Sequence, residues 1–214
     1  NHLVIHKQTD KIHRWKTWEP KSPFAPYVDA HVFCDEYDSL LAKEIRVIAN
    51  QSYLGQIEES KFLSAANWKS LWTKYNLFTW SHSVFKILRD RIYDSYDEYC
   101  KGVDIKPLDR KDIWIRGWFA RVEPGQNIGM HSHALHENAF VSGNMALHNL
   151  NPWTTTDYWI PLFSLYHGYF QVKNEPGVVT LFPSWLQHRV DTNQSSKVRY
   201  TLAFDLFNEY NFKY

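Results

Sequence analysis

The second half of the chain is a succession of short apolar segments that are separated by turn residues. Several of these segments alternate apolar and polar residues with a period of two, which is typical of β-strands with one buried face. Turn signals between them include Glu123-Pro124-Gly125 and Asn174-Glu175-Pro176-Gly177. The expected strands cover residues 113–122, 128–133, 140–148, 168–172, 178–182 and 198–207. Short strands at this spacing predict a sandwich or jelly roll.

Residues 149–165 interrupt this series and form the least regular part of the second half. We expect an irregular loop here. A long loop of this kind in a compact domain is often functional.

The first half of the chain predicts an N-terminal arm followed by helices. Residues 1–30 contain three prolines, which disfavour a helix and permit an edge strand and an extended arm. A helix is expected over residues 36–50, with Asp35 as its N-cap. A shorter helix is expected within residues 64–75. The apolar positions of the first helix are Leu40, Leu41, Ile45 and Ile48.

The clearest helical pattern runs over residues 83–101, where apolar residues repeat every three or four positions and charged residues occupy the opposite face. Gly102 follows as the expected C-cap. Its apolar stripe, which we expect to pack on the core, consists of Val84, Ile87, Leu88, Ile92, Tyr96 and Tyr99. The predicted class is therefore mainly β with supporting helices.

The length of 214 residues is sufficient for one domain with a full hydrophobic core. We expect a single domain over residues 1–214, with the arm and supporting helices in residues 1–110 and the β core in residues 111–208. A net charge of +1 gives no overall field that would attract nucleic acid or an anionic membrane.

Two cysteines, Cys34 and Cys100, lie far apart in the sequence, which indicates neither a zinc ribbon nor a disulfide framework. No stretch approaches 18 apolar residues, so the sequence predicts no membrane span. From these features we expect a soluble, cytoplasmic protein in a reducing compartment.

Three histidines have a spacing that predicts a mononuclear metal site. His131 and His133 share one face of an extended segment, because side chains alternate with a period of two. His188 opens another extended segment, directly after the corner at Pro183-Ser184. Three imidazoles on one side of an octahedral ion leave the opposite positions open for substrate and oxygen.

Two neighbouring residues compete with His133 as the second ligand. His136 is a further imidazole, and Glu137 offers a carboxylate if the strand bulges after His133. The regular alternation of His131 and His133 favours the pair of histidines over these alternatives.

A cation follows the third histidine at a distance that allows it to share the same pocket. Arg199 lies on the last expected strand, which we expect to pair beside His188, and Thr201 faces the same side. The guanidinium either binds a carboxylate in a bidentate manner or forms a surface ion pair. Asn144 is a weaker candidate for the pocket, because an Asn after Ser142-Gly143 is also an ordinary turn residue.

Taken in order, His-x-His at residues 131–133, Ser142-Gly143, Phe-Pro-Ser-Trp-Leu-x-His at residues 182–188 and Arg-x-Thr at residues 199–201 resemble the small iron(II)/2-oxoglutarate oxygenases. The resemblance covers roughly the last hundred residues. It implies a double-stranded β-helix braced by helices on its outer face. The sequence departs from the superfamily pattern where His133 replaces an acidic ligand, and from the subfamily pattern at Asn144-Met145.

The resemblance also implies an activity and its co-substrates. His131, His133 and His188 would hold Fe(II), and Arg199, with Thr201 and Asn144 beside it, would bind 2-oxoglutarate. The expected reaction uses oxygen to hydroxylate an unidentified substrate, with release of succinate and CO2, and needs no catalytic side chain beyond the metal ligands. The alternatives are a cupin-type iron dioxygenase with three histidines and no 2-oxoglutarate, and a non-catalytic jelly-roll module for binding or structure.

Overall fold

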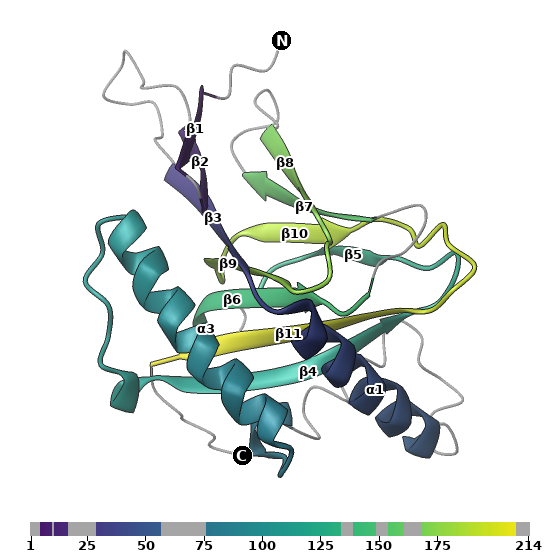
Figure 1. Cartoon of the computed structure of the whole chain (residues 1–214). Helices are drawn as coiled ribbons and strands as arrows, with labels where there is room; N and C mark the ends of the chain where they lie inside the picture. Colours follow the sequence, from purple (N-terminus) through teal and green to yellow (C-terminus); the bar gives the residue numbers. More distant parts are fainter. Residues whose placement is uncertain are drawn as a thin grey trace, which may run out of the picture.

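The computed structural model describes residues 5–9, 11–16, 29–56, 76–133, 139–148, 154–160 and 168–208. Within these ranges the chain forms two antiparallel sheets that face each other, with helices on the outside of the larger sheet (Figure 1). No helix in these ranges is both long and apolar enough to cross a membrane. Both cysteines are free.

The larger sheet joins N-terminal strands to strands of the second half of the chain. Its order is β1-β2-β3-β9-β6-β11-β4, so the N-terminal part of the chain adds three strands to the sheet beside β9. The bounds are β1 Ile5–Thr9, β2 Ile12–Lys16, β3 Asp29–Glu36, β9 Val178–Pro183, β6 Ala139–Ala146, β11 Arg199–Phe207 and β4 Trp114–Val122.

The smaller sheet has the order β5-β10-β7-β8. Its strands are β5 Ile128–His131, β10 Gln187–Val190, β7 Thr155–Ile160 and β8 Gly168–Lys173. From β4 onward the chain therefore changes sheet after every strand, except between β7 and β8, which pair with each other. This alternation is the double-stranded β-helix, and the predicted fold class is confirmed.

One predicted loop contains a strand. Residues 155–160 form β7, which lies between β10 and β8 near the middle of the smaller sheet. The first residues of this strand are polar, so the sequence shows no apolar pattern there. In the structure Thr155, Thr156 and Asp157 are buried and form hydrogen bonds with other side chains. The expectation of an irregular loop over 149–165 is wrong for these residues, because tertiary hydrogen bonds satisfy a strand that looks polar in the sequence.

The first described helix, α1 (Ser39–Gln56), begins three residues later than predicted. Asp38 caps it, since its Oδ1 accepts a hydrogen bond from the backbone N of Leu40 at 2.8 Å. Asp35 is not the cap, because β3 continues through Glu36 in register with β9. The predicted stripe holds at Ile45 and Ile48, which are buried, whereas Leu40 is 67% exposed.

The second described helix, α3 (Ser83–Gly102), matches the prediction closely, and only Ile87 of its expected stripe is exposed. Gly102 is the last helical residue and Val103 is the C-cap, so the predicted role of the glycine is wrong. A Cβ atom there would lie 1.9 Å from Cδ1 of Ile12, the end of a flexible side chain, so a larger residue at this position would require that side chain to move. The helix expected within residues 64–75 lies outside the described residues.

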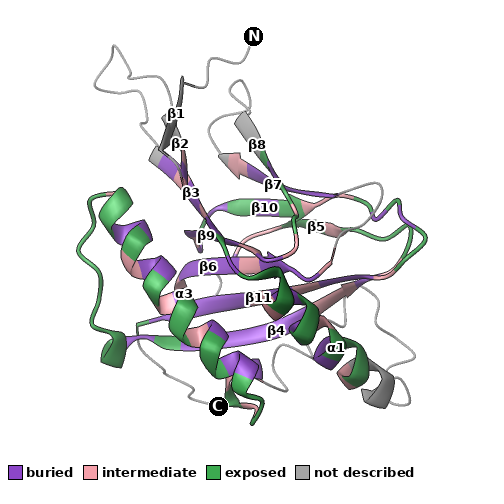
Figure 2. Ribbon diagram, in the orientation of Figure 1, coloured by how far each residue is buried: buried purple, intermediate pink, exposed green. Residues whose placement is uncertain are grey.

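Figure 2 shows buried residues along the strands and on parts of both helices, and the buried apolar residues among those described form two clusters. The larger one lies between the two helices and the outer face of the large sheet, and it includes Ile45, Leu88, Leu202 and Phe204. A smaller one, which includes Phe182, lies between the two sheets. The inner space between the sheets is thus only partly filled by apolar side chains, and His131, His133 and His188 line the cavity that remains.

Candidate metal centre

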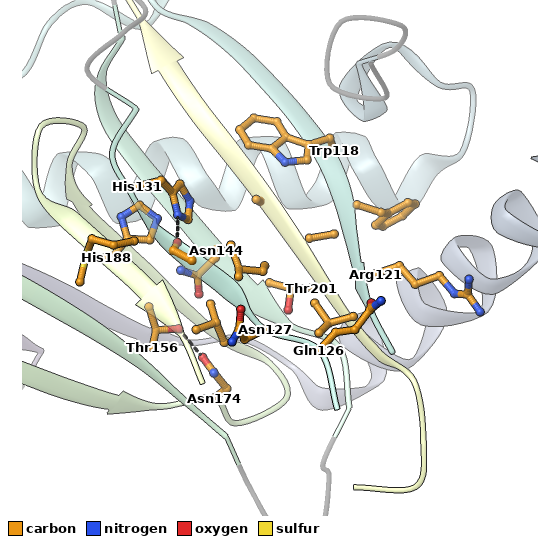
Figure 3. Close-up of a pocket in the computed structure, with 18 of the residues that line it drawn as sticks. Trp118, Arg121, Gln126, Asn127, His131, Asn144, Thr156, Asn174, His188 and Thr201 are labelled. Atoms are coloured by element: carbon orange, nitrogen blue, oxygen red, sulfur yellow. Dashed lines mark hydrogen bonds between the residues drawn. The ribbon is translucent and has the colours of Figure 1, made fainter. Parts of the chain in front are cut away.

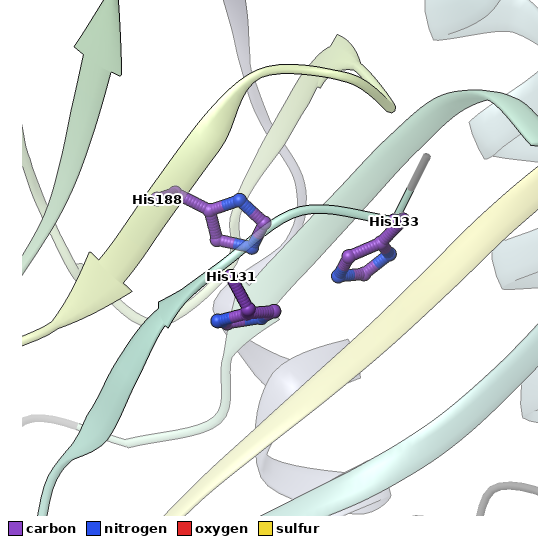
Figure 4. Close-up of side chains that lie close together, drawn as sticks. All are labelled: His131, His133 and His188. Carbon is purple, nitrogen blue, oxygen red and sulfur yellow. The ribbon is translucent and has the colours of Figure 1, made fainter. Parts of the chain in front are cut away.

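The structure brings the three predicted histidines together from β5, from the residues that follow it and from β10 (Figure 4). His131 on β5 and His188 on β10 are cross-strand partners, and their ring centroids lie 4.2 Å apart. His133 follows β5, and its ring centroid lies 5.2 Å from that of His188. Potential ligand nitrogens of all three lie within 4.8 Å of one another. Three imidazoles at this separation can bind one metal ion.

Hydrogen bonds set the same tautomer in each of the three rings. Nδ1 of His131 lies 2.8 Å from the carbonyl oxygen of Gly129, and Nδ1 of His188 lies 3.0 Å from that of Leu186. Carbonyl oxygens only accept, so each Nδ1 donates its proton. His133 Nδ1 is likewise bonded, to a carboxylate oxygen of Asp205 at 2.5 Å. In all three rings Nδ1 is therefore engaged, and Nε2 is the atom left for a metal.

Burial keeps at least two of these rings neutral. Desolvation lowers the pKa of His131 to about 4, and the nearby imidazole of His133 adds to this, while the bond to Gly129 opposes it. Desolvation lowers the pKa of His188 well below its ordinary value, and the other two histidines contribute. A neutral imidazole is the form that binds a metal ion.

The Phe-Pro-Ser-Trp-Leu-x-His segment holds two of the three histidines in place. Ser184, at the corner after β9, accepts a hydrogen bond from the backbone N of His133 at 2.9 Å through its carbonyl oxygen. Leu186 is fully buried between the sheets, and its carbonyl oxygen is the one that orients His188. Trp185 between them is 42% exposed. The motif therefore acts through its backbone and its buried Leu186.

Behind His133 lies a buried polar group that the sequence reasoning missed. Asp205 on β11 is fully buried, and its Oδ1 accepts hydrogen bonds from His133 and from the hydroxyl of Ser142 at 2.6 Å. Ser142 also bonds the hydroxyl of Ser184 at 2.8 Å. One signal could have found Asp205, because it is an acid in an otherwise apolar segment and has the same parity along the strand as Arg199 and Thr201.

A cavity of about 490 Å³ extends from the histidines between the two sheets (Figure 3). Asn144 on β6 and Thr201 on β11 both line it, as the sequence analysis expected for a pocket. Apolar walls next to the histidines come from Trp118, whose ring centroid is 5.7 Å from that of His133, and Phe182, 4.7 Å from that of His188. The cavity is apolar near the histidines and carries polar groups further along.

Arg199 does not lie on a strand beside His188, so this prediction is wrong. Its strand β11 belongs to the large sheet and pairs with β4 and β6, whereas β10 pairs with β5 and β7. The crossing between sheets after each strand places the two residues in different sheets. Arg199 is not among the residues that line the cavity, although Thr201 on the same strand face is.

The guanidinium of Arg199 is buried with unused donors. The residue is 2% exposed, and its Nη1 donates to the carbonyl oxygen of Asp191 at 3.2 Å. Its Nε and Nη2 have no hydrogen-bond partner among the described residues. Desolvation lowers the pKa of Arg199 to about 10, while the charge of Asp191 acts in the opposite direction. A buried cation with unused donors favours an anionic ligand.

The two rival ligands, His136 and Glu137, lie outside the described residues. Among the residues that are described, His131, His133 and His188 form the group that could hold a metal ion.

Comparison with known proteins supports the predicted resemblance. Residues 163–205 match a family model described as "Putative 2OG-Fe(II) oxygenase". This segment is less than half of the chain and includes His188, Arg199, Thr201 and Asp205. A search of curated proteins found no match.

Solved structures with the same fold include three that align over most of this chain. The epimerase SnoN, solved with Fe3+, alpha ketoglutarate and nogalamycin RO, has a TM-score of 0.57 and 11% identity, over 83% of this chain and 78% of its own. A Pseudomonas putida prolyl-4-hydroxylase has a TM-score of 0.53 and 10% identity, over 86% and 88%. The non-heme monooxygenase ThoJ has a TM-score of 0.54 and 12% identity, over 81% and 72%. The chain is thus similar to this oxygenase superfamily in fold and in the matched segment.

Proposed function

We propose that this protein is an iron(II)/2-oxoglutarate-dependent oxygenase that hydroxylates a substrate and releases succinate and CO2. One observation carries the proposal. Three imidazoles with Nε2 available lie at one end of a cavity, and the strand face that forms another wall of this cavity carries a buried guanidinium with unused donors. A metal ion and a dicarboxylate are the ligands that this pairing fits.

The histidines fit Fe(II) by their chemistry. His131, His133 and His188 would hold the ion through Nε2, since imidazole is a common ligand of iron and each Nδ1 is already engaged. Three protein ligands on one side of the ion leave positions for the co-substrate and oxygen. Bound iron would supply the oxidation chemistry, in which 2-oxoglutarate is decarboxylated and the substrate is oxidised.

Side chains on β11 and β6 of the large sheet could bind the distal carboxylate of 2-oxoglutarate. Nε and Nη2 of Arg199 lack acceptors among the described residues, and a carboxylate would satisfy them with charge-assisted hydrogen bonds. Thr201 lies two positions further on the same face and lines the cavity, so its hydroxyl is available as another donor. Asn144 lines the cavity from β6, the neighbouring strand. The chain thus provides donors for a dicarboxylate on strands that line the same cavity as the proposed metal ligands.

The remaining walls would position the substrate and exclude water. Trp118 is 2% exposed and Phe182 is 1% exposed, and both lie beside the histidine rings. Apolar groups at this position lower the local dielectric and so strengthen the polar contacts to bound ligands. No nucleophilic side chain is required, because the chain's part in the reaction is to bind and to orient.

Anaerobic reconstitution tests this function. The wild-type chain, mixed with Fe(II) and 2-oxoglutarate without oxygen, is expected to develop the visible charge-transfer band of the iron–2-oxoglutarate chelate. Admission of oxygen should then convert 2-oxoglutarate to succinate. His188→Ala is the matched control and should show neither signal. A wild-type chain that binds Fe(II) and 2-oxoglutarate but never forms succinate would contradict the proposed reaction.

One observation favours a second candidate function. The ligand set contains His133 where an acidic ligand stands in the superfamily pattern, and three histidines are also the ligand set of cupin-type iron dioxygenases that use no 2-oxoglutarate. For this alternative, the wild-type chain would retain iron and show no band with 2-oxoglutarate. A chain that retains no metal at all would instead favour the non-catalytic jelly-roll module.

A further inference from the structure

The buried carboxylate of Asp205 is not one of the three proposed metal ligands, and the proposed function does not yet explain why it is there. Its Oδ1 accepts from His133 and Ser142, and its Oδ2 has no hydrogen-bond partner among the described residues. Arg116, which is also buried, lies opposite Asp205 in the register of β4 and β11, and Nδ1 of His133 contacts Oδ1 of Asp205 directly. The carboxylate thus contacts one imidazole of the proposed metal centre.

The hydrogen bonds alone do not require an acid at this position. An asparagine has a side-chain oxygen that could accept from both His133 and Ser142. Burying a carboxylate is costly unless a positive charge compensates it. Arg116 lies opposite on β4, and a metal ion bound through His133 would add a further positive charge close to the carboxylate.

The three histidines differ in the groups that hold them. His131 and His188 donate to backbone carbonyl oxygens, which are neutral, whereas His133 donates to a carboxylate. Two-histidine, one-carboxylate iron sites carry their negative charge on a ligand. Here the carboxylate lies one imidazole further out, behind the residue that occupies the acidic ligand's place.

We propose that Asp205 is a positioning residue of the metal centre. It orients His133 through Nδ1, and through this ring it provides the negative charge that a carboxylate ligand gives in related sites. A carboxylate partner also makes the opposite ring nitrogen a stronger donor to the metal. The proposal rests on the proposed function, because it requires a divalent cation bound by His131, His133 and His188.

Two serines complete this support. Ser142 donates to Asp205, and its hydroxyl also contacts that of Ser184, whose carbonyl oxygen accepts from the backbone N of His133. His133 is therefore fixed at two atoms by one hydrogen-bonded group that joins β6, β11 and the corner after β9. A rigid support of this kind is what a metal ligand outside regular secondary structure requires.

The test is a titration with Co(II), whose visible absorption reports binding without turnover. Asp205→Asn keeps an acceptor oxygen and removes the charge, so we expect Co(II) affinity to fall by about 10- to 100-fold. We also expect a changed Co(II) spectrum in this variant. Asp157→Asn is the matched control, because Asp157 is also fully buried and accepts hydrogen bonds from Thr155, Gln171 and Arg189, without contact to the three histidines. Its Co(II) affinity should equal that of the wild type.

A double-mutant comparison separates this role from a general effect on folding. In a His133→Ala background, Asp205→Asn should cause no further loss of Co(II) affinity, because the two residues act as one unit. An equal loss with and without His133 would overturn the proposal, as would unchanged affinity and spectrum in Asp205→Asn.

The test also distinguishes a protein that binds no metal from a variant that does not fold. A wild-type chain that binds no Co(II) overturns the metal centre itself and, with it, this proposal. If Asp205→Asn does not fold, as judged by circular dichroism, Ser142→Ala replaces it, since this variant keeps the carboxylate and removes one of its two donors. We then expect a loss of about three- to tenfold, and unchanged affinity would count against the role of Asp205.

Discussion

The two faces of β11 differ in what they contribute to the molecule. On one face, Leu202, Phe204 and Leu206 are fully buried in the large apolar core under α1 and α3. On the other face, Thr201 lines the cavity and Asp205 supports His133. Successive side chains of a strand point to opposite faces, so one segment of nine residues serves both purposes.

This contrast teaches that stability and chemistry are separated here by strand alternation and not by distance along the chain. The helix-covered face buries many apolar side chains, so losses there should appear in the free energy of unfolding. The face toward the cavity holds polar groups that are only partly satisfied, so losses there should appear in ligand binding. The predictions below test whether the two kinds of effect separate in this way.

The largest expected effect is on metal binding. His188→Ala removes one of three ligands and should abolish metal retention during dialysis, which metal analysis of the dialysed protein would measure. His82→Ala is the control, because His82 is exposed and lies at the start of α3, away from the cluster. Unchanged iron content in His188→Ala would show that the cluster is not the metal site.

Arg199→Leu should retain iron and lose affinity for 2-oxoglutarate. Removing a desolvated charge-assisted contact costs on the order of 2 to 5 kcal/mol, which corresponds to roughly thirty-fold to several thousand-fold in affinity. Arg199→Lys restores the charge without the planar fork and should recover part of the binding. Titration of 2-oxoglutarate into the iron-loaded variants would measure both. Equal affinity in wild type and Arg199→Leu would favour the three-histidine dioxygenase.

Neighbouring residues on β11 offer a direct comparison of its faces. Leu202→Ala should reduce the free energy of unfolding by about 2 to 5 kcal/mol, because it leaves a cavity in a packed core, with metal affinity of the folded protein unchanged. Thr201→Ala should leave stability nearly unchanged and weaken 2-oxoglutarate binding. Chemical denaturation and ligand titration would measure the two effects. A loss of metal affinity in Leu202→Ala would show that the faces are coupled.

The smallest expected effect concerns pH. Burial, with the nearby charges of Arg46 and Lys197, lowers the pKa of His148 to about 4. Below its ordinary pKa of about 6.5 the unfolded chain binds a proton that the folded chain does not, so stability should fall as the pH decreases from about 6.5 to 4. His131 shares this direction. The thermal midpoint of the metal-free protein should decrease over this range, and less steeply in His148→Gln.

His148→Gln keeps an acceptor for the backbone N of Tyr200, which now donates to Nε2 of His148. A variant with the same pH dependence as wild type would show that His148 does not contribute to it.

The local patterns of this chain were readable because they depend on near neighbours. Alternation predicted most of the strands, helical spacing predicted α3, and the spacing of His131, His133 and His188 predicted their convergence. The two-residue periodicity also placed Arg199 and Thr201 on one face. Each of these inferences needs only the geometry of a single strand or helix.

Tertiary structure alone decided which strands are neighbours and which polar groups are buried. It placed β11 beside β4 and β6 instead of β10, and it made a strand of residues 155–160. It also brought Asp205 to His133 across 72 positions of sequence. Strand pairing and burial depend on residues that are distant along the chain, so a local sequence pattern cannot predict them. The sequence by itself determined the three imidazoles, and the fold determined the carboxylate behind one of them.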